Sequence, residues 1–349
     1  MVFPKAEFNK ASVKDADMNK ELLVDLFNEI ETEKLNIHSI LLLKEGSRVF
    51  RASAHTFTED TKEEVYSVSK SFTSVAIGIL CDLNILHLDD YILYFFSKEI
   101  SDYLPGYEKI QVKHLLSMSS GQEKDIFSDL TPNDDLYKLF FNQPLVHKPG
   151  EVFNYSNFSS FILSAIVTKV TGKSLNDFLN EYLYKHIGME KPNWNQVKGI
   201  NFGASGIHVS ANDMARFGLL LLNDGNWDGK QIISKKYLDL ATQTQIETKN
   251  CDEEADKFGY GFQFWINSFG DYRCAGLYRQ YIVINKKFNL VFVVKAFEER
   301  QLLDLFENYI IPACKKGWNY CDYSLRDYTR RFKQNSIKII EKEKEMRID

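Results

Sequence analysis

Hydrophobic positions three to four residues apart predict the main helices of this chain. Residues 21–32 place their apolar side chains on one face, and the same spacing recurs from Ser67 to about Leu86. The second segment also contains Ser74 and Gly78, small residues that allow a neighbouring element to pack closely. The sequence therefore predicts an amphipathic helix near the N-terminus and a central, buried helix that begins at Ser67.

Further helices are predicted in the middle third of the chain. Residues 112–118 and 158–171 follow the helical pattern, and Gly172 follows the second where a left-handed C-cap is common. Residues 210–213 fit a capping box that opens a helix over residues 214–222. The middle third is therefore expected to be mainly helical.

An apolar alternation with a period of two predicts strands at both ends of the chain. Near the N-terminus, residues 37–43 and 48–54 form a hairpin around a turn that contains Gly46. Near the C-terminus, short turns separate four predicted strands at residues 258–267, 272–276, 280–285 and 290–297. The simplest assembly places the hairpin and the C-terminal strands in one antiparallel sheet.

The predicted fold class is α/β, of the α+β kind: an antiparallel sheet flanked by helices, with an inserted all-helical lobe. Residues 1–66 and 201–321 are expected to form the α/β lobe, and residues 67–200 the helical lobe, with the active cleft between them. Residues 322–349 form a charged C-terminal tail. This tail is interpreted as a solvated helix or frayed end, and a partner-binding segment is the alternative.

Composition narrows the possible functions. With 349 residues, of which 44% are hydrophobic and 26% charged, the chain has the make-up of a soluble globular protein. Its formal net charge of −5 argues against a nucleic-acid partner. The five cysteines are scattered and predicted to be reduced thiols. No secretory signal pattern or membrane-spanning run is seen, so a cytoplasmic location is expected, with a processed secreted form left open.

Ser67 and Lys70 are the strongest candidates for catalytic residues. They lie three positions apart on the predicted central helix, so the hydroxyl and the amine share a face and can meet. A lysine kept neutral by desolvation or nearby positive charge can take the serine proton. The helix N-terminus also leaves the Ser67 backbone N–H for an oxyanion. Taken alone, Ser-x-x-Lys arises by chance about once or twice in a chain of this length.

Tyr155 and Asn157 form a second candidate element, directly before a predicted helix. A loop there can aim the Tyr155 hydroxyl into a cleft as a proton relay and the Asn157 amide as a donor to a carbonyl. A tyrosine that anchors a turn would give the same pattern.

Cys274, Ala275 and Gly276 form a third candidate element, on a predicted strand. A glycine-containing edge strand can lie alongside a substrate, and the Leu277 N–H would then be the second oxyanion donor. A plain strand with a bulge explains the same residues.

These three elements occur in the order seen in a known family. The chain resembles the serine β-lactamase and penicillin-binding-protein superfamily, specifically the class C-like branch with its carboxylesterases, D-aminopeptidases and 6-aminohexanoate-dimer hydrolase. The resemblance runs from about residue 20 to about residue 300. It is carried by residues 66–74, 112–121, 148–157, 205–218 and 280–285.

The resemblance implies a β-lactamase/transpeptidase-like fold and an acyl-enzyme mechanism. Ser67 would attack a carbonyl, and Lys70 and Tyr155 would shuttle protons. Asn157 would orient the acyl group, while the backbone N–H groups of Ser67 and Leu277 would hold the oxyanion. No metal or organic cofactor is required. The expected function is that of a serine hydrolase acting on small carboxylic esters or amides.

The chain departs from the family pattern at the strand. Penicillin-recognising members carry a lysine or often a histidine where this chain has Cys274, and glycines where it has Tyr278 and Arg279. Arg273 is expected to face away if Cys274 faces inward, since adjacent strand residues point to opposite faces. We therefore expect weak or absent β-lactam hydrolysis and a narrowed cleft.

Two other functions stay open. The chain could be a D-amino-acid peptidase or β-lactamase of the same fold, or a catalytically idle relative that serves as a sensor or scaffold. The altered strand favours the idle form, whereas the intact serine, lysine, tyrosine and asparagine favour an enzyme. The sequence does not indicate the oligomeric state.

Overall fold

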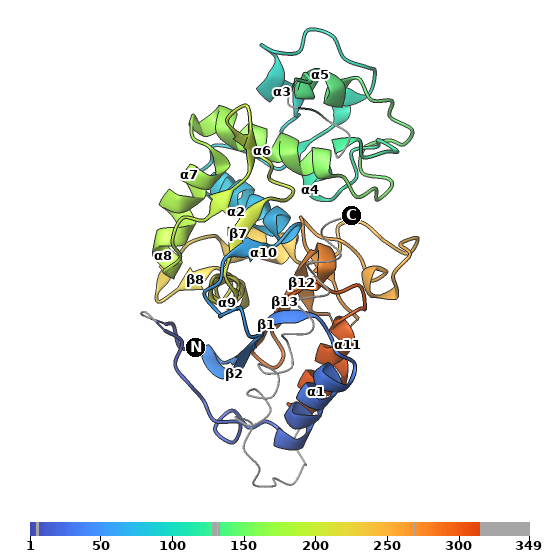
Figure 1. The fold of residues 1–349 in the computed structure, drawn as a ribbon. Helices are drawn as coiled ribbons and strands as arrows, with labels where there is room; N and C mark the ends of the chain where they lie inside the picture. The colour runs from blue at the N-terminus through green and yellow to red at the C-terminus, as the bar shows by residue number, and fades with distance from the viewer. Residues whose placement is uncertain (5–6, 128–130, 132, 269, 315–349) are drawn as a thin grey trace. The chain divides into compact units, whose positions relative to one another are not determined.

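The chain forms two compact units in the computed structural model, which describes residues 1–4, 7–127, 131, 133–268 and 270–314 (Figure 1). Unit 1 comprises Met1–Glu63, Val209–Asn223 and the described residues from Ala275 onward, and unit 2 comprises Glu64–His208 and Asp224–Cys274. The predicted lobes have different bounds, chiefly because residues 224–274 belong to unit 2. Whether those lobes fold as domains stays a prediction, and the tail at 322–349 lies outside the described residues.

Unit 1 contains an antiparallel sheet that joins strands from both ends of the chain. Its strands within unit 1 include β1 (Ile37–Lys44), β2 (Ser47–Ser53), β12 (Gln280–Asn285) and β13 (Leu290–Ala296). β1 pairs with β2 on one side and with β13 on the other, and β13 pairs in turn with β12. The predicted pairing of the N-terminal hairpin with the C-terminal strands is therefore confirmed.

Helices cover both faces of this sheet, as predicted. On one face, α9 (Ala211–Leu222) approaches so closely that a Cβ at Gly218 would lie 2.5 Å from the Val291 side chain. On the other face, Phe27 of α1 (Lys20–Thr32) contacts Phe50 of β2, with ring centroids 5.3 Å apart. β1 is consequently buried over all but its last residue.

Unit 2 is built around α2 (Val68–Asp82), which is buried from Val68 to Leu80. This helix packs against α6 (Asn157–Thr171), α7 (Leu175–Leu179) and α10 (Lys235–Ala241). A Cβ at Gly78 would lie 2.5 Å from the Tyr237 ring of α10, so the glycine makes that packing possible. The predicted central helix is confirmed, although it ends four residues early.

The remaining elements are short. The helical ones are α3 (Leu93–Phe96), η1 (Tyr107–Lys109), α4 (Val112–Leu116), α5 (Leu136–Phe141), η3 (Asn180–Tyr184), α8 (Lys185–Ile187), η4 (Glu254–Asp256), η5 (Leu277–Arg279), α11 (Leu303–Leu305), η6 (Phe306–Ile310) and α12 (Ile311–Ala313). The strands are β3 (Glu63–Glu64), β4 (Asn193–Trp194), β5 (Gln196–Val197), β6 (Ile200–Asn201), β7 (Ile207–Val209), β8 (Asn226–Trp227), β9 (Lys230–Gln231), β10 (Trp265–Ile266) and β11 (Tyr272–Gly276). Among the described residues, no helix is long and apolar enough to cross a membrane.

Both predicted helix caps are confirmed, whereas one predicted strand is wrong. The Ser210 capping box and the left-handed Gly172 C-cap are both present. Residues 258–267, however, contain only the two-residue strand β10. A Cβ at Gly261 would lie 2.0 Å from the Ala241 carbonyl oxygen, and Gln263 has φ of +66°. The backbone there turns against α10 instead of extending.

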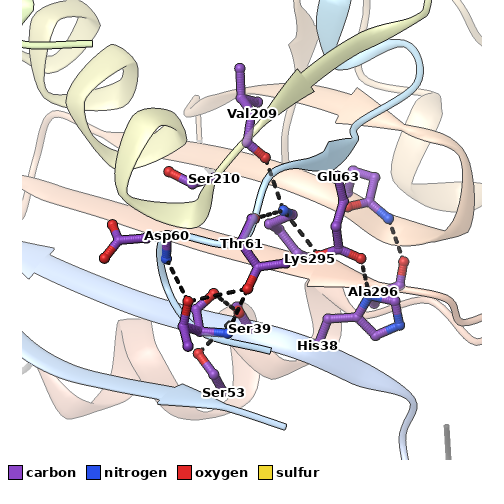
Figure 2. A network of polar contacts seen from close by, with 12 residues as sticks. His38, Ser39, Ser53, Asp60, Thr61, Glu63, Val209, Ser210, Lys295 and Ala296 are labelled. Carbon is purple, nitrogen blue, oxygen red and sulfur yellow. Dashed lines mark hydrogen bonds and ion pairs between the residues drawn. The ribbon is translucent and has the colours of Figure 1, made fainter. Parts of the chain in front are cut away.

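A buried lysine joins several segments of unit 1 (Figure 2). Lys295 of β13 donates to the carbonyl oxygens of Thr61 and Val209, each at 2.9 Å, and pairs with the Glu63 carboxylate at 3.0 Å. His38 of β1 contacts the other oxygen of Glu63 at 2.6 Å. The segment that leads from the sheet toward Ser67 is thus anchored by charged groups.

Candidate active site

Ser67 and Lys70 meet at the N-terminal end of α2. The Lys70 Nζ lies 3.0 Å from the Ser67 Oγ, which confirms the predicted pairing of amine and hydroxyl. The chain enters the helix through Tyr66, whose φ of +47° lies in the left-handed region. This conformation costs about 1–2 kcal/mol for a residue with a Cβ. The Ser69 hydroxyl donates to the Tyr66 carbonyl at 2.6 Å and helps to hold it.

The Lys70 amine is buried and lies within hydrogen-bond distance of three oxygen atoms. Besides Ser67, these are the Asn157 Oδ1 at 2.6 Å and the Ala204 carbonyl oxygen at 3.0 Å. Burial lowers the pKa of Lys70 to about 7, and the negative charge of Asp125 opposes part of that shift. A substantial fraction of the amine is therefore neutral at neutral pH and able to accept a proton.

The Ala204 carbonyl reaches Lys70 because the preceding residue is glycine. Gly203 has φ of +67°, and a Cβ there would lie 2.7 Å from the Ser160 carbonyl oxygen on α6. The Gly203 carbonyl accepts from the Thr73 hydroxyl of α2 at 2.7 Å. This contact could not be predicted from side-chain patterns, since the group that binds Lys70 is a backbone oxygen.

Tyr155 reaches the same pair of residues from the loop before α6. The Asn154 N–H donates to the Met118 carbonyl oxygen at 2.8 Å, which holds this loop in place. The Tyr155 hydroxyl shares a hydrogen bond with Ser67, and its ring centroid lies 4.7 Å from the Lys70 Nζ. Burial raises the pKa of Tyr155 above its usual value, so the phenol stays protonated. Serine, lysine, tyrosine and asparagine are therefore together in unit 2.

Asp125 is a site residue that the sequence reasoning missed. Its carboxylate accepts hydrogen bonds from the Asn157 side-chain amide at 2.8 Å and from the backbone N–H groups of Asn157 and Phe158 at 3.0 and 3.1 Å. Because the amide NH₂ is directed to Asp125, the Asn157 oxygen faces Lys70. An isolated aspartate in a loop gave no signal in the sequence, since its partners lie 32 and 33 positions away.

Cys274 brings no cation to the site. It is buried on β11, and burial raises the pKa of its thiol to about 12. The neighbouring Arg273 is paired instead with Asp256. Ala275, Gly276 and Leu277 belong to unit 1, so their place beside Ser67 stays a prediction.

A family model described as Beta-lactamase matches residues 38–296. The chain belongs to the Beta-lactamase family. The resemblance inferred from the motifs is therefore confirmed, and the match takes in all the candidate residues from Ser67 to Leu277.

Individual relatives match about half of this chain at 26–30% identity. Protein flp of Staphylococcus aureus strain MW2 is 30% identical over 195 residues, which are 50% of this chain and 38% of that protein. The chain thus matches well under half of the length of this relative. Penicillin-binding protein 4* of Bacillus subtilis strain 168 is 26% identical over 195 residues, which are 50% of this chain and 41% of that protein.

Solved structures share the fold at low sequence identity. A family VIII carboxylesterase has a TM-score of 0.67 at 16% identity and covers 88% of this chain and 99% of its own. An octameric penicillin-binding protein homologue from Pyrococcus abyssi has a TM-score of 0.67 at 20% identity, and the match covers 83% of this chain and 76% of that one. At these identities the likeness shows the fold alone. The predicted β-lactamase-like α/β fold is confirmed.

Proposed function

We propose that this protein is a serine hydrolase that forms an acyl-enzyme on Ser67 and cleaves small carboxylic esters or amides. The surroundings of the Lys70 amine carry the proposal. A neutral amine has two N–H donors and one lone pair. Asn157 and Ala204 offer acceptors for the two donors, at 2.6 and 3.0 Å. The lone pair is then directed to the Ser67 hydroxyl at 3.0 Å, as a general base requires.

The reaction proceeds in two steps. The Ser67 Oγ attacks the substrate carbonyl carbon while its proton passes to Lys70, and the Ser67 backbone N–H, with the predicted Leu277 N–H, holds the oxyanion. Tyr155 then relays a proton to the leaving alcohol or amine as its bond to the acyl carbon breaks. Water attacks the acyl-enzyme and releases the acid. Tyr155 suits this relay because its raised pKa keeps the phenol protonated.

Neutral substrates are favoured over carboxylates. Cys274 stays uncharged at neutral pH, and Asp256 neutralises the adjacent Arg273. A substrate carboxylate, such as that of a penicillin, therefore gains no cationic partner from these two strand residues. We accordingly expect ester or amide cleavage with weak or absent β-lactam hydrolysis.

A fluorophosphonate probe tests the nucleophile. Wild-type protein should be labelled, and Ser67→Ala should lose both labelling and turnover of p-nitrophenyl esters by about 1,000-fold or more. Ser97→Ala, at an exposed serine of the same unit, is the matched control and should label normally. Folded wild-type protein that neither labels nor turns over would instead favour the idle sensor or scaffold.

The substrate class is tested by running the chromogenic ester panel beside nitrocefin. Ester turnover with little or no nitrocefin cleavage supports the proposal. Rapid nitrocefin cleavage, or acylation by a labelled penicillin, would favour the β-lactamase or D-amino-acid peptidase alternative.

A further inference from the structure

Tyr155 is one of four aromatic side chains that contact one another in unit 2. Phe153, Tyr260 and Trp265 are the others, and the Tyr260 and Trp265 rings are 4.8 Å apart. Phe153 meets the Tyr155 ring at 54° and Tyr260 meets it at 81°. Trp265, by contrast, is stacked nearly parallel on Tyr155, at 15° and 5.9 Å. The indole face therefore borders the phenol ring.

Trp265 is itself held by a buried arginine. The two residues are register partners where β10 pairs with β11, and the Arg273 guanidinium lies 5.5 Å from the Trp265 ring centroid. Arginine in this position is attracted to the indole face. Trp265 thus contacts both Arg273 and Tyr155.

The arginine is fixed by polar partners in turn. Arg273 is only 1% exposed, pairs with the Asp256 carboxylate, and donates to the Asn267 Oδ1 at 2.5 Å and the Ala255 carbonyl oxygen at 3.1 Å. A buried charge is costly unless it is paired in this way. Because well-packed apolar residues would often give equal or greater stability, stability alone does not explain an arginine at this position. The planar guanidinium, held by several hydrogen bonds, is a rigid support for the indole.

We propose that Trp265, held by Arg273, is a positioning residue that keeps the Tyr155 hydroxyl on Ser67. The hydroxyl lies at the end of the phenol axis, so rotation about the Cα–Cβ bond of Tyr155 swings it away from Ser67. The stacked indole on the ring face blocks that rotation in one direction. This inference rests on the proposed function, because it requires Tyr155 to act as the proton relay.

A double-mutant cycle with a p-nitrophenyl ester tests the positioning role. Trp265→Leu should lower kcat by about 10- to 100-fold with little change in KM, because small misplacements of a reacting group are costly. In the Tyr155→Phe background, where no hydroxyl remains to be positioned, the same substitution should change kcat less than about twofold. Phe153→Leu removes a ring that lies at a steep angle to Tyr155, and should leave kcat within about threefold in the wild-type background.

Several outcomes would overturn the inference. An equal loss in both backgrounds, or a rise in KM alone, would show that Trp265 acts on something other than the Tyr155 hydroxyl. If Trp265→Leu does not fold, the cycle is repeated with Trp265→Phe, for which a smaller but still background-dependent loss is expected. Full turnover in Ser67→Ala would overturn the proposed function as well, whereas a dead Ser67→Ala with an additive cycle overturns the positioning role alone.

Discussion

Lys70 is held between two opposing electrostatic effects. Burial disfavours its ammonium form, whereas the carboxylate of Asp125 favours it. The balance brings the pKa down from the ordinary 10.5 to about 7. A lysine in water would be almost fully protonated at that pH and could not accept the Ser67 proton. The amine is thus able to act as a base because its burial away from water outweighs the effect of the Asp125 charge.

The pH profile of ester turnover should report this balance. The general base must be unprotonated, so kcat/KM should rise with pH, with an inflection near 7, and level off above it. Lys70→Ala should nearly abolish acylation while circular dichroism shows an intact fold. Near wild-type turnover of Lys70→Ala at pH 7 would mean that another group is the base.

Asp125→Asn provides a second measurement on the same amine. Loss of the negative charge should move the inflection to lower pH, because Asp125 raises the pKa of Lys70. Glu108→Gln, at an exposed carboxylate of unit 2, is the matched control and should leave the inflection unchanged. An unshifted inflection in Asp125→Asn would contradict the assigned electrostatic role.

Sequence spacing predicts contacts within one helical turn better than contacts between distant segments. Helix geometry alone predicts that Ser67 and Lys70 meet. The contact of Lys70 with Asn157 could not be derived, since it joins residues 87 positions apart. The Ala204 carbonyl and the Asp125 carboxylate were missed for the same reason, and their contacts depend on how the loops fold.

At the scale of elements, η5 keeps a backbone that suits glycine although it carries large side chains. Tyr278 and Arg279 have φ values of +56° and +65°. Each pays a conformational cost that glycine would avoid. Tyr278 stacks on Phe297 with ring centroids 4.0 Å apart, and Arg279 donates to the Glu299 carbonyl oxygen at 3.1 Å. These contacts offset part of the backbone strain.

Replacing both residues with glycine tests whether they limit substrate size. Tyr278→Gly combined with Arg279→Gly should widen the range of acyl and leaving groups accepted across an ester series. Asn289→Gly relieves a positive φ of +54° between β12 and β13 and is the control that should not change selectivity. Unchanged selectivity in the double variant would refute the predicted narrowing.

Most elements could be predicted because their patterns are long. The helix at Lys20–Thr32 and the strands at Ile37–Lys44 and Leu290–Ala296 each have a consistent period over several residues. The strand predicted over residues 258–267 is wrong. The alternating aromatic residues there are typical of a strand, but the glycines at 259 and 261 allow the backbone to turn closely against Thr244 and Ala241. The spacing of hydrophobic residues along the sequence does not predict such contacts.

At the scale of the whole molecule, the Lys295 network accounts for an unusual buried charge. Its ammonium group makes three polar contacts, two with backbone carbonyl oxygens and one with the Glu63 carboxylate. Lys295→Met would leave all three acceptors without this donor. We expect a loss of about 3 kcal/mol in the free energy of unfolding, measured by urea denaturation.

Lys44→Met is the matched control, because among the described residues Lys44 donates one longer hydrogen bond, of 3.3 Å, to the Phe288 carbonyl oxygen. It should cost less than about 1 kcal/mol. Equal stabilities for the two variants would show that the network contributes little beyond what any partly buried lysine does.

The pairing of β1 with β13 also constrains how the chain can fold during synthesis. Every residue of unit 2 has been made once the ribosome has added Cys274, whereas β12 and β13 follow it. Until β13 has been made, β1 has β2 as its only sheet partner, so its apolar run at residues 40–43 presents an unpaired edge. Unpaired strand edges can form hydrogen bonds with strands of other chains and so promote aggregation. A nascent or truncated chain that stops before Leu290 is therefore exposed to aggregation at β1.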